Sequence, residues 1–388
     1  MAAAESAGLN AQALARLHAA FAGFVGRRRV PGAVLLIERR GTVACFESLG
    51  LQDPVSGSPM REDSIFRIFS MTKPIVSVAA MMLVERGRLS LRDPVARFLP
   101  EFAAVQLGVE RDGRLDRVPP RRAMTVHDLL RHTAGLSYEF HEPSAVQRCY
   151  VDASIGSRRR SNAEHCAVLA GLPLMHEPGS VWNYSRATDV LGRIVEVLGG
   201  RPLGEHLRRE VFDPLDMPDT GFTVPPADHA RLAEPFATDP DSAAPVKLFD
   251  ARVPAALESG GGGLFSTAAD YARFLRLLLN GGTLGGVRLL GRKTVEFMTA
   301  DHLGALPRAG DVLPPGHGFG LGFAVKTHLG MHTEPGSLGT YGWSGAAGTA
   351  FFVDPQEALL ALVMVQAPGQ LDEVRELFRQ LVYAALDA

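Results

Sequence analysis

The segment from Met71 to Glu85 restricts the possible folds more than any other part of the sequence. Apolar side chains occupy nearly every face of a helix drawn over this segment, and a helix that is apolar all round is buried. Pro74 is tolerated because it falls in the first turn, and Gly87 is suited to end the helix. The pattern therefore predicts a helix that runs through the centre of the molecule.

A candidate catalytic pair stands at the entry to this helix, in the tetrad Ser70-Met71-Thr72-Lys73. Lys73 is one of only four lysines in a chain with 40 Lys+Arg. Arg keeps its proton in proteins, whereas Lys loses its proton once burial or a neighbouring charge lowers its pKa. A Lys one helical turn after a Ser therefore indicates a hydroxyl nucleophile with an amine base. The bland alternative is chance, because many chains contain a Ser and a Lys three residues apart.

The composition limits the classes of partner. A chain of 388 residues, 46% hydrophobic and 21% charged, is long enough for two domains or for one domain with an inserted lobe. A net charge of −2 gives no reason to expect nucleic acid or an anionic membrane as a partner. The short basic runs at 27–29 and 158–160 are typical of solvated faces. No apolar stretch approaches the length of a membrane span.

Metal and cofactor sites are not indicated either. The three cysteines (Cys45, Cys149, Cys166) lack Cys-x-x-Cys spacing, which argues against a disulfide framework or a zinc site. His127 and His132 have no Glu between them at the spacing of a zinc-binding helix, so packing or hydrogen bonding is expected of both. The first residues lack the basic and apolar regions of a signal peptide, and a cytoplasmic location is the expectation. The sequence makes no prediction of an oligomeric state.

Strand patterns lie at both ends of the chain, with mainly helical patterns between them. The predicted strands are 32–38, 42–46, 320–325, 348–353 and 359–365, and the segment 65–69 leads into Ser70. Amphipathic helices are expected near 14–24 and over 372–385. These elements predict an α/β fold in which a mostly antiparallel sheet is flanked by helices and carries an inserted helical lobe. The expected division is a discontinuous sheet domain, 1–88 with 300–388, and a lobe over 89–299, with the active cleft between them.

Tyr184 is a second candidate, in a segment just before a helix predicted from Thr188. A Tyr at such a junction can present its phenol oxygen to a cleft. An ordinary phenol has a pKa near about 10, so it needs a nearby cation to act as a base at neutral pH. The Lys73 ammonium could supply that positive charge. A Tyr that packs its ring in the core is an equally good explanation.

The third candidate is the glycine-rich segment 339–348, which enters the predicted strand 349–353. Small residues let a substrate lie close to strand backbone, where N–H groups can bind an oxyanion. The same composition is typical of a glycine-rich bulge.

Taken together and in their order along the chain, six sequence segments resemble motifs of the serine β-lactamase/penicillin-binding-protein superfamily, on its class-C-like branch. Within that branch the chain is most similar to the family VIII carboxylesterases. The matching segments are Ser70-Met71-Thr72-Lys73, Leu129-Leu130-Arg131-His132-Thr133-Ala134-Gly135-Leu136, Tyr184-Ser185, Pro214-Leu215-Asp216-Met217, Ser259-Gly260-Gly261-Gly262 and Trp343-Ser344-Gly345. The resemblance covers nearly the whole chain and implies the β-lactamase/transpeptidase-like fold.

The resemblance also implies roles for individual residues. Ser70 would be the acylated nucleophile, with Lys73 and Tyr184 sharing the general-base and general-acid work. The oxyanion hole would be the backbone N–H groups of Ser70 and Ala346. Substrate contacts are expected from Phe69, Trp343, Ser344, Gly345 and Arg186.

Two departures from the family pattern concern the substrate. Penicillin-recognising members carry Lys-Thr-Gly or His-Thr-Gly at the third element, and Trp343 occupies the place of that cation here. Arg186 stands where class C enzymes have an Asn, and it could grip an acidic substrate or form a salt bridge on the helix face. Both changes favour an uncharged small-molecule ester or amide over a β-lactam.

The expected reaction is serine acyl-enzyme hydrolysis of short-chain or small-acid esters. A transacylase, an amide or oligomer hydrolase, or a weak β-lactamase of the same superfamily are alternatives. A non-catalytic sensor on the same fold is disfavoured, because degenerate relatives usually lose the Ser, the Lys or the Tyr, and this chain keeps all three.

Overall fold

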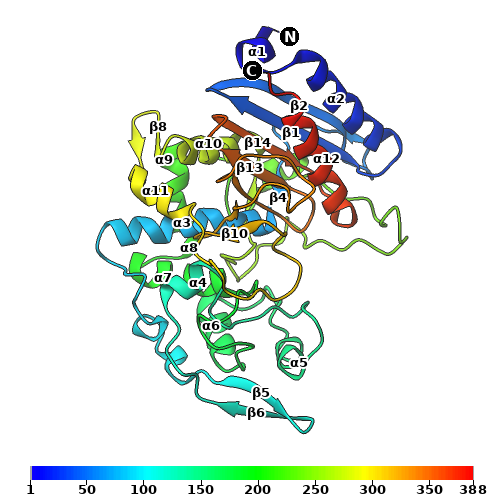
Figure 1. Cartoon of the computed structure of the whole chain (residues 1–388). Helices are drawn as coiled ribbons and strands as arrows, with labels where there is room; N and C mark the ends of the chain where they lie inside the picture. Colours follow the sequence, from blue (N-terminus) through cyan, green and yellow to red (C-terminus); the bar gives the residue numbers. More distant parts are fainter. Residues whose placement is uncertain (1, 388) are drawn as a thin grey trace.

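An eight-stranded antiparallel sheet, assembled from both ends of the chain, forms one half of the molecule (Figure 1). The structure is a computed structural model and describes residues 2–387. In sheet order the strands are β10 (His317–Phe319), β11 (Ala324–Lys326), β12 (Tyr341–Ser344), β13 (Ala350–Asp354), β14 (Leu359–Met364), β1 (Gly32–Arg39), β2 (Thr42–Asp53) and β3 (Ser58–Pro59). The C-terminal strand β14 pairs with the N-terminal strand β1, which confirms the predicted sheet.

Alternate side chains of β1 divide the core into two layers, because successive residues of a strand point to opposite faces. Leu35 and Ile37 pack against α2 (Ala11–Gly26) and α12 (Leu371–Tyr383). Val34 and Leu36 belong to the larger core on the other face, which contains α3 (Thr72–Glu85) and α10 (Ala268–Leu279). Figure 1 shows α2 and α12 on the outer side of the sheet and α10 on its inner side. The sheet is therefore covered by helices on both faces, as predicted.

The central helix α3 is buried from Thr72 to Leu83, as its apolar pattern predicts. It begins at Thr72, after the 3₁₀ turn η1 (Phe69–Met71). The hydroxyl of Tyr271, on α10, donates a hydrogen bond of 2.8 Å to the carbonyl oxygen of Met71. In Figure 1, α3 crosses the middle of the molecule, between the sheet and the helices below it.

The remaining helices lie mainly on the far side of α3 from the sheet, apart from α1, which precedes α2, and α9 and α11, near α10 (Figure 1). They are α1 (Ala2–Ser6), α4 (Val126–Leu130), α5 (Ala145–Asp152), α6 (Asn162–Ala170), α7 (Ala187–Gly199), α8 (Leu203–Leu207), α9 (Asp213–Leu215) and α11 (Arg292–Met298). Three small antiparallel pairs complete the chain: β4 (Phe66–Arg67) with β7 (Phe265–Ser266), β5 (Leu107–Arg111) with β6 (Arg114–Val118), and β8 (Thr283–Leu284) with β9 (Val287–Arg288). Thr125 and Asp128 form a capping box at the start of α4. The division into 1–88 with 300–388 and 89–299 stays a prediction, and α10, which falls within 89–299, contacts β14 and β1.

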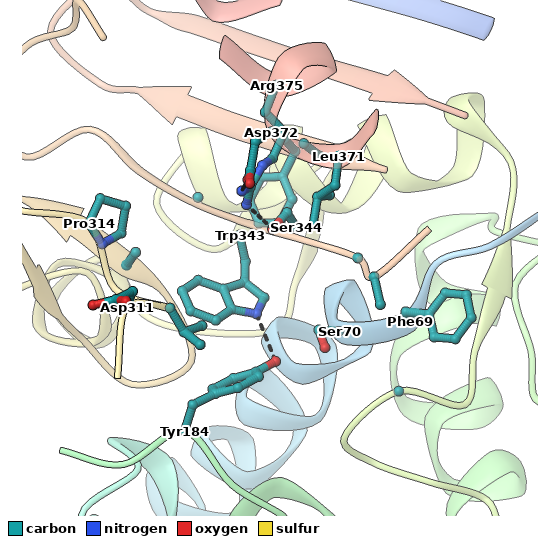
Figure 2. Close-up of a pocket in the computed structure, with 18 of the residues that line it drawn as sticks. Phe69, Ser70, Tyr184, Asp311, Pro314, Trp343, Ser344, Leu371, Asp372 and Arg375 are labelled. Carbon is teal, nitrogen blue, oxygen red and sulfur yellow. Dashed lines mark hydrogen bonds and ion pairs between the residues drawn. The ribbon is translucent and has the colours of Figure 1, made fainter. Parts of the chain in front are cut away.

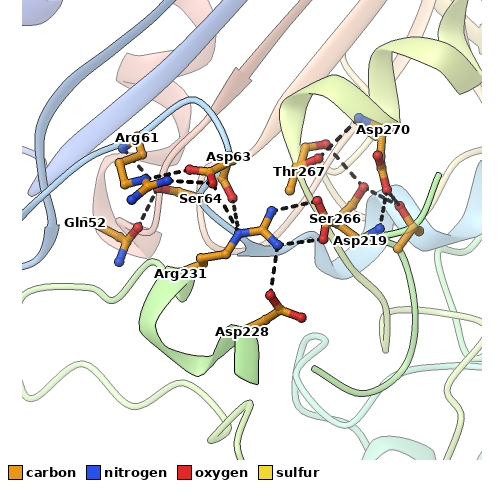
Figure 3. Close-up of polar contacts among 11 residues, drawn as sticks. Gln52, Arg61, Asp63, Ser64, Asp219, Asp228, Arg231, Ser266, Thr267 and Asp270 are labelled. Carbon is orange, nitrogen blue, oxygen red and sulfur yellow. Dashed lines mark hydrogen bonds and ion pairs between the residues drawn. The ribbon is translucent and has the colours of Figure 1, made fainter. Parts of the chain in front are cut away.

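A polar cluster centred on Arg231 links the segment 219–231 to Asp63, which lies in the connection between β3 and β4 (Figure 3). The guanidinium donates to both carboxylate oxygens of Asp219, at 2.7 and 2.6 Å, and to Asp228 at 3.1 Å. Its Nε donates to the carbonyl oxygen of Asp63 at 3.0 Å. Asp270, on α10, accepts from the Asp219 N–H at 2.8 Å. The Arg231 side chain therefore ties the connection 219–231 to Asp63, and Asp219 extends the cluster to α10.

The strand predictions differ from the structure where glycine interrupts the chain. The predicted strand 320–325 is only partly right: residues 320–323 form a turn between β10 and β11, where Gly322 has a φ of 100°, which favours glycine, and only Ala324 and Val325 belong to β11. The segment 65–69, which leads into Ser70, contains the short strand β4 before the chain turns into η1. Tyr341–Ser344 forms the separate strand β12, which was not predicted because Gly342 within it and its mixed composition give no strand pattern.

Candidate active site

Ser70 and Lys73 come together at the N-terminal end of the buried helix. Ser70 lies in η1, and Lys73 lies in the first turn of α3. The Nζ atom of Lys73 is 3.1 Å from the Oγ atom of Ser70. Phe69, immediately before Ser70, has a φ of 43°, a left-handed conformation that costs an ordinary residue about 1–2 kcal/mol. The surrounding packing holds the chain in this turn, and the turn presents the Ser70 hydroxyl to the cavity described below.

Lys73 is fully buried, and its nitrogen has three polar neighbours. Nζ lies 2.6 Å from the carbonyl oxygen of Gly261 and 3.0 Å from the hydroxyl oxygen of Tyr138, besides Ser70. Burial lowers the pKa of Lys73 to about 7; the Asp189 carboxylate opposes this shift and the Arg186 guanidinium adds to it. A neutral amine has two hydrogens and one lone pair. It can donate to Gly261 and Tyr138 and still direct the lone pair at the Ser70 hydroxyl.

Tyr184 lies beside this pair, held by a hydrogen bond from the third element. The indole Nε1–H of Trp343 donates to the Tyr184 hydroxyl at 3.2 Å, and Figure 2 shows the phenol oxygen directed toward Ser70. The Lys73 nitrogen is 4.4 Å from the centroid of the Tyr184 ring. The expectation that the Lys73 charge makes Tyr184 acidic is wrong: burial raises the pKa of Tyr184 above its ordinary value, and the hydrogen bonds that join Tyr184 to Ser70 and Trp343 oppose this shift only in part. Tyr184 therefore keeps its proton at neutral pH and can donate it.

Three residues around Lys73 were missed by the sequence reasoning. Tyr138 and Gly261 contact the amine directly, and Asp189 holds the turn that carries Gly261. One carboxylate oxygen of Asp189 accepts from the Ser259 hydroxyl at 2.5 Å and from the Gly261 N–H at 2.9 Å. Gly260, Gly261 and Gly262 were noted only as part of a glycine motif, and no local pattern shows that a carbonyl of this turn faces the amine.

The end of β12 closes the site on the other side of Ser70. A Cβ atom at Gly345 would clash with the carbonyl oxygen of Ile68, so glycine permits this strand to approach the nucleophile turn. Ala346 follows in the turn between β12 and β13, where its N–H has no hydrogen-bond acceptor within residues 2–387. The Ser344 hydroxyl accepts from the guanidinium of Arg375, on α12, at 2.7 Å. The roles of Ser70 and Ala346 as oxyanion donors remain a prediction.

Arg186 forms a salt bridge in this structure, the second of the two expected possibilities. Its guanidinium lies 2.6 Å from Glu139 and 3.6 Å from Asp189, and its carbon atom Cζ lies 4.8 Å from the centroid of the Tyr138 ring. These carboxylates neutralise Arg186, which leaves little charge for an acidic substrate.

A cavity of about 860 Å³ opens over Ser70 (Figure 2). All the predicted site residues except the buried Lys73 line it: Phe69, Ser70, Tyr184, Arg186, Trp343, Ser344, Gly345 and Ala346. Tyr138 and Gly261 also line the cavity, so the groups around the Lys73 amine face the same space.

Among residues 2–387, no group of three or more His, Cys, Asp or Glu side chains is arranged to hold a metal ion. Every helix in the same range is too short or too polar to cross a lipid bilayer.

The beta-lactamase family model matches residues 17–386 of this chain. The chain belongs to the beta-lactamase family. Esterase EstB of Burkholderia gladioli is a relative that is 34% identical over 95% of this chain and 95% of its own length. Protein Rv1367c of Mycobacterium tuberculosis strain H37Rv is 38% identical over 86% of this chain and 85% of its own length.

A solved structure of similar fold is EstCE1, described as a hydrolase with promiscuous acyltransferase activity. It superimposes with a TM-score of 0.82 and 29% identity, over 96% of this chain and 99% of its own. This beta-lactamase-family chain has Trp343 at the third element, where it bonds to Tyr184. The predicted fold class and the relationship to esterases of this family are thus confirmed.

Proposed function

We propose that this protein is a serine carboxylesterase of the family VIII type, which cleaves small-acid esters through an acyl-enzyme on Ser70. One observation carries the proposal: a buried amine with a pKa of about 7 lies 3.1 Å from the Ser70 hydroxyl, beside a phenol that keeps its proton. A base is most effective when its pKa lies near the working pH. The relationship to EstB supports the same reaction class.

Acylation uses the three groups in turn. The neutral Lys73 amine takes the Ser70 proton as Oγ bonds to the acyl carbon. The tetrahedral intermediate then collapses, and Tyr184 gives its proton to the departing alcohol oxygen. The Lys73 ammonium returns a proton to the phenolate, which restores both groups.

Deacylation repeats these transfers with water as the nucleophile. Lys73 takes a proton from the water as it attacks the acyl carbon, and the Ser70 oxygen leaves with a proton from Tyr184. The N–H groups of Ser70 and Ala346 are the proposed donors to the oxyanion. Loss of one such donor typically costs about 3–4 kcal/mol in the transition state.

The surroundings of Ser70 favour an ester with no charge beside the reacting carbonyl. Trp343 offers a neutral N–H that is already bonded to Tyr184, and the Arg186 charge is paired with Glu139. Neither side chain supplies the free cation that a carboxylate next to the carbonyl would need.

Turnover of p-nitrophenyl butyrate, together with mass spectrometry after treatment with a fluorophosphonate, tests this function. Sustained turnover and a single adduct on the Ser70 peptide are expected, and both should disappear in Ser70→Ala. Nitrocefin should be cleaved far more slowly than the ester. A burst of one equivalent without turnover, or an adduct elsewhere, would contradict the proposal.

Acyl transfer to an alcohol is a second candidate, favoured by the acyltransferase activity described for EstCE1. Hydrolysis and transfer share the acyl-enzyme and differ only in the nucleophile that reaches it. Adding a primary alcohol to the p-nitrophenyl butyrate assay separates them, since a transferase forms the new ester in preference to butyrate. Release of butyrate alone would assign hydrolysis.

A further inference from the structure

Arg158 is a cation in the catalytic cavity with no anionic partner. Four arginines line the cavity: Arg158, Arg186, Arg375 and Arg379. Three of them pair with a carboxylate: Arg186 with Glu139, Arg375 with Asp372 and Arg379 with Glu334. Across residues 2–387, the Arg158 side chain has no carboxylate within 4.0 Å and donates no hydrogen bond.

The expectation of a solvated face for the run 158–160 is therefore wrong at its first residue. Arg159 is exposed, and Arg160 donates to backbone carbonyl oxygens at 2.8 Å. Arg158 instead turns inward. Its backbone carbonyl accepts from the N–H groups of Ala256 and Leu257, at 3.1 and 3.2 Å, which fixes the position from which the side chain starts.

The Arg158 guanidinium rests on an aromatic wall that begins beside the nucleophile. Its carbon atom Cζ lies 3.6 Å from the centroid of the Phe249 ring, and the Phe249 and Phe69 centroids are 5.2 Å apart. Phe69 immediately precedes Ser70. The wall therefore extends from the reacting hydroxyl to the free guanidinium.

The local electrostatics favour an anion at this end of the cavity. Partial burial, with a smaller contribution from Arg67, lowers the pKa of Arg158 to about 10, so the side chain is still charged at neutral pH. The Glu234 carboxylate pairs with Arg67 at 3.0 Å, so it is not available as a counter-ion for Arg158. A half-buried cation without a counter-ion loses hydration, and a bound carboxylate would offset that loss by charge-assisted hydrogen bonds.

The geometry assigns this end of the cavity to the acyl part of the substrate. The departing alcohol oxygen must reach its proton donor, Tyr184. Figure 2 shows Phe69 on the opposite side of Ser70 from Tyr184 and Trp343. An acyl chain that points away from Tyr184 therefore runs along Phe69 and Phe249 toward Arg158.

We propose that Arg158 binds a carboxylate at the far end of the acyl chain, so that the preferred substrates are half-esters of dicarboxylic acids. The proposal rests on the esterase function above, and refines it: the ester itself is neutral and the charge sits several carbons away. Stacking of Arg158 on Phe249 as a purely structural contact is the competing explanation, and the test must separate the two.

The test compares acidic esters with neutral isosteres. Ethyl hydrogen glutarate is paired with ethyl 5-oxohexanoate, and ethyl hydrogen adipate with ethyl 6-oxoheptanoate, where a methyl ketone replaces the carboxylate. Ethanol release gives the ratio of kcat/KM for the acidic to the neutral ester. The variants are Arg158→Gln, Arg158→Lys and, as a charge-matched control, Arg159→Gln.

The wild-type ratio is expected to exceed one for at least one chain length, and to fall about 10- to 100-fold in Arg158→Gln, mainly through KM. Arg158→Lys should retain part of the preference, and Arg159→Gln all of it. If neutral esters are cleaved but the ratio stays the same in Arg158→Gln, this inference is overturned while the esterase function stands. If 3-butyryloxypropanoate, with its carboxylate on the alcohol side, is the better substrate in an Arg158-dependent way, the acyl-side assignment is overturned. If no ester is cleaved, the esterase function fails first.

Discussion

The indole Nε1–H of Trp343 donates a hydrogen bond to the hydroxyl oxygen of Tyr184, across a distance of 3.2 Å. These two residues are 159 positions apart in the chain. By the family resemblance, Trp343 stands where penicillin-recognising members carry a cation, and here the side chain offers a neutral donor instead. The indole N–H uses one lone pair of the Tyr184 phenol oxygen. The phenol proton is then still free to face Ser70.

Trp343→Phe keeps an aromatic ring at this position and removes only the donor. We expect kcat for p-nitrophenyl butyrate to fall about tenfold, the value of one ordinary hydrogen bond. Trp182→Phe is the control, because the Trp182 Nε1–H is buried without an acceptor in the described residues. Equal losses in the two variants would show that ring packing, and not the bond to Tyr184, is what matters.

The pH dependence should follow the Lys73 amine. Burial lowers the pKa of Lys73 to about 7, and only the neutral form can accept the Ser70 proton. The kcat/KM for a neutral ester should therefore rise with pH through about 7, reach a plateau above it, and fall about tenfold per pH unit below it. A profile that stays flat down to pH 5 would exclude the amine as the base.

Lys73→Arg keeps the positive charge but cannot release its proton. Turnover should fall by about 10²–10⁴-fold, the contribution typical of a general base. Lys73→Met, which is neutral, should be equally inactive, since it also lacks a base. Circular dichroism and thermal unfolding would establish that both variants are folded. Full activity of the Arg variant would refute the proposed role.

Tyr184→Phe removes the proposed proton donor and preserves the ring that packs near Lys73 and Trp343. Its kcat should fall about 10²–10⁴-fold for an ethyl ester. The loss should be smaller for a p-nitrophenyl ester, because that leaving group departs without protonation. The same loss for both esters would indicate that Tyr184 positions other groups and does not supply the proton.

The Arg231 cluster shown in Figure 3 should contribute to stability. Arg231→Met leaves Asp219 and Asp228 without their shared cation, and we expect the free energy of unfolding to fall by about 1–3 kcal/mol. Arg61→Met is the matched control: the Arg61 side chain is 64% exposed and, among residues 2–387, pairs only with Asp63, two residues away. Its effect should be much smaller than that of Arg231→Met, because exposed ion pairs contribute little to stability. Urea unfolding of the wild-type protein and the two variants tests this prediction. Equal unfolding midpoints would contradict it.

Local sequence patterns were sufficient to predict the Ser70–Lys73 pair, the buried helix α3 and several strands of the sheet. Ser70 and Lys73 are one helical turn apart, and helical periodicity places such residues on one face whatever the rest of the chain does. The burial of α3 followed from its apolar side chains, and β1, β13 and β14 followed from runs of apolar residues. The strand β12 was missed because glycine and mixed polarity hide its pattern.

Contacts between segments that are distant in the chain could not be predicted from local sequence patterns. Tyr138 and Gly261 meet the Lys73 amine across 65 and 188 residues, and no spacing rule connects them. Arg158 and Arg159 look alike in the sequence, yet one lines the cavity and the other is exposed.

The sequence alone determined which groups could react, because the nucleophile, its amine neighbour and the buried helix depend on residues close together in the chain. Only the tertiary structure decided their protonation and their surroundings. Burial lowers the pKa of Lys73 and raises that of Tyr184, and burial is a property of the packed molecule, which no short segment contains.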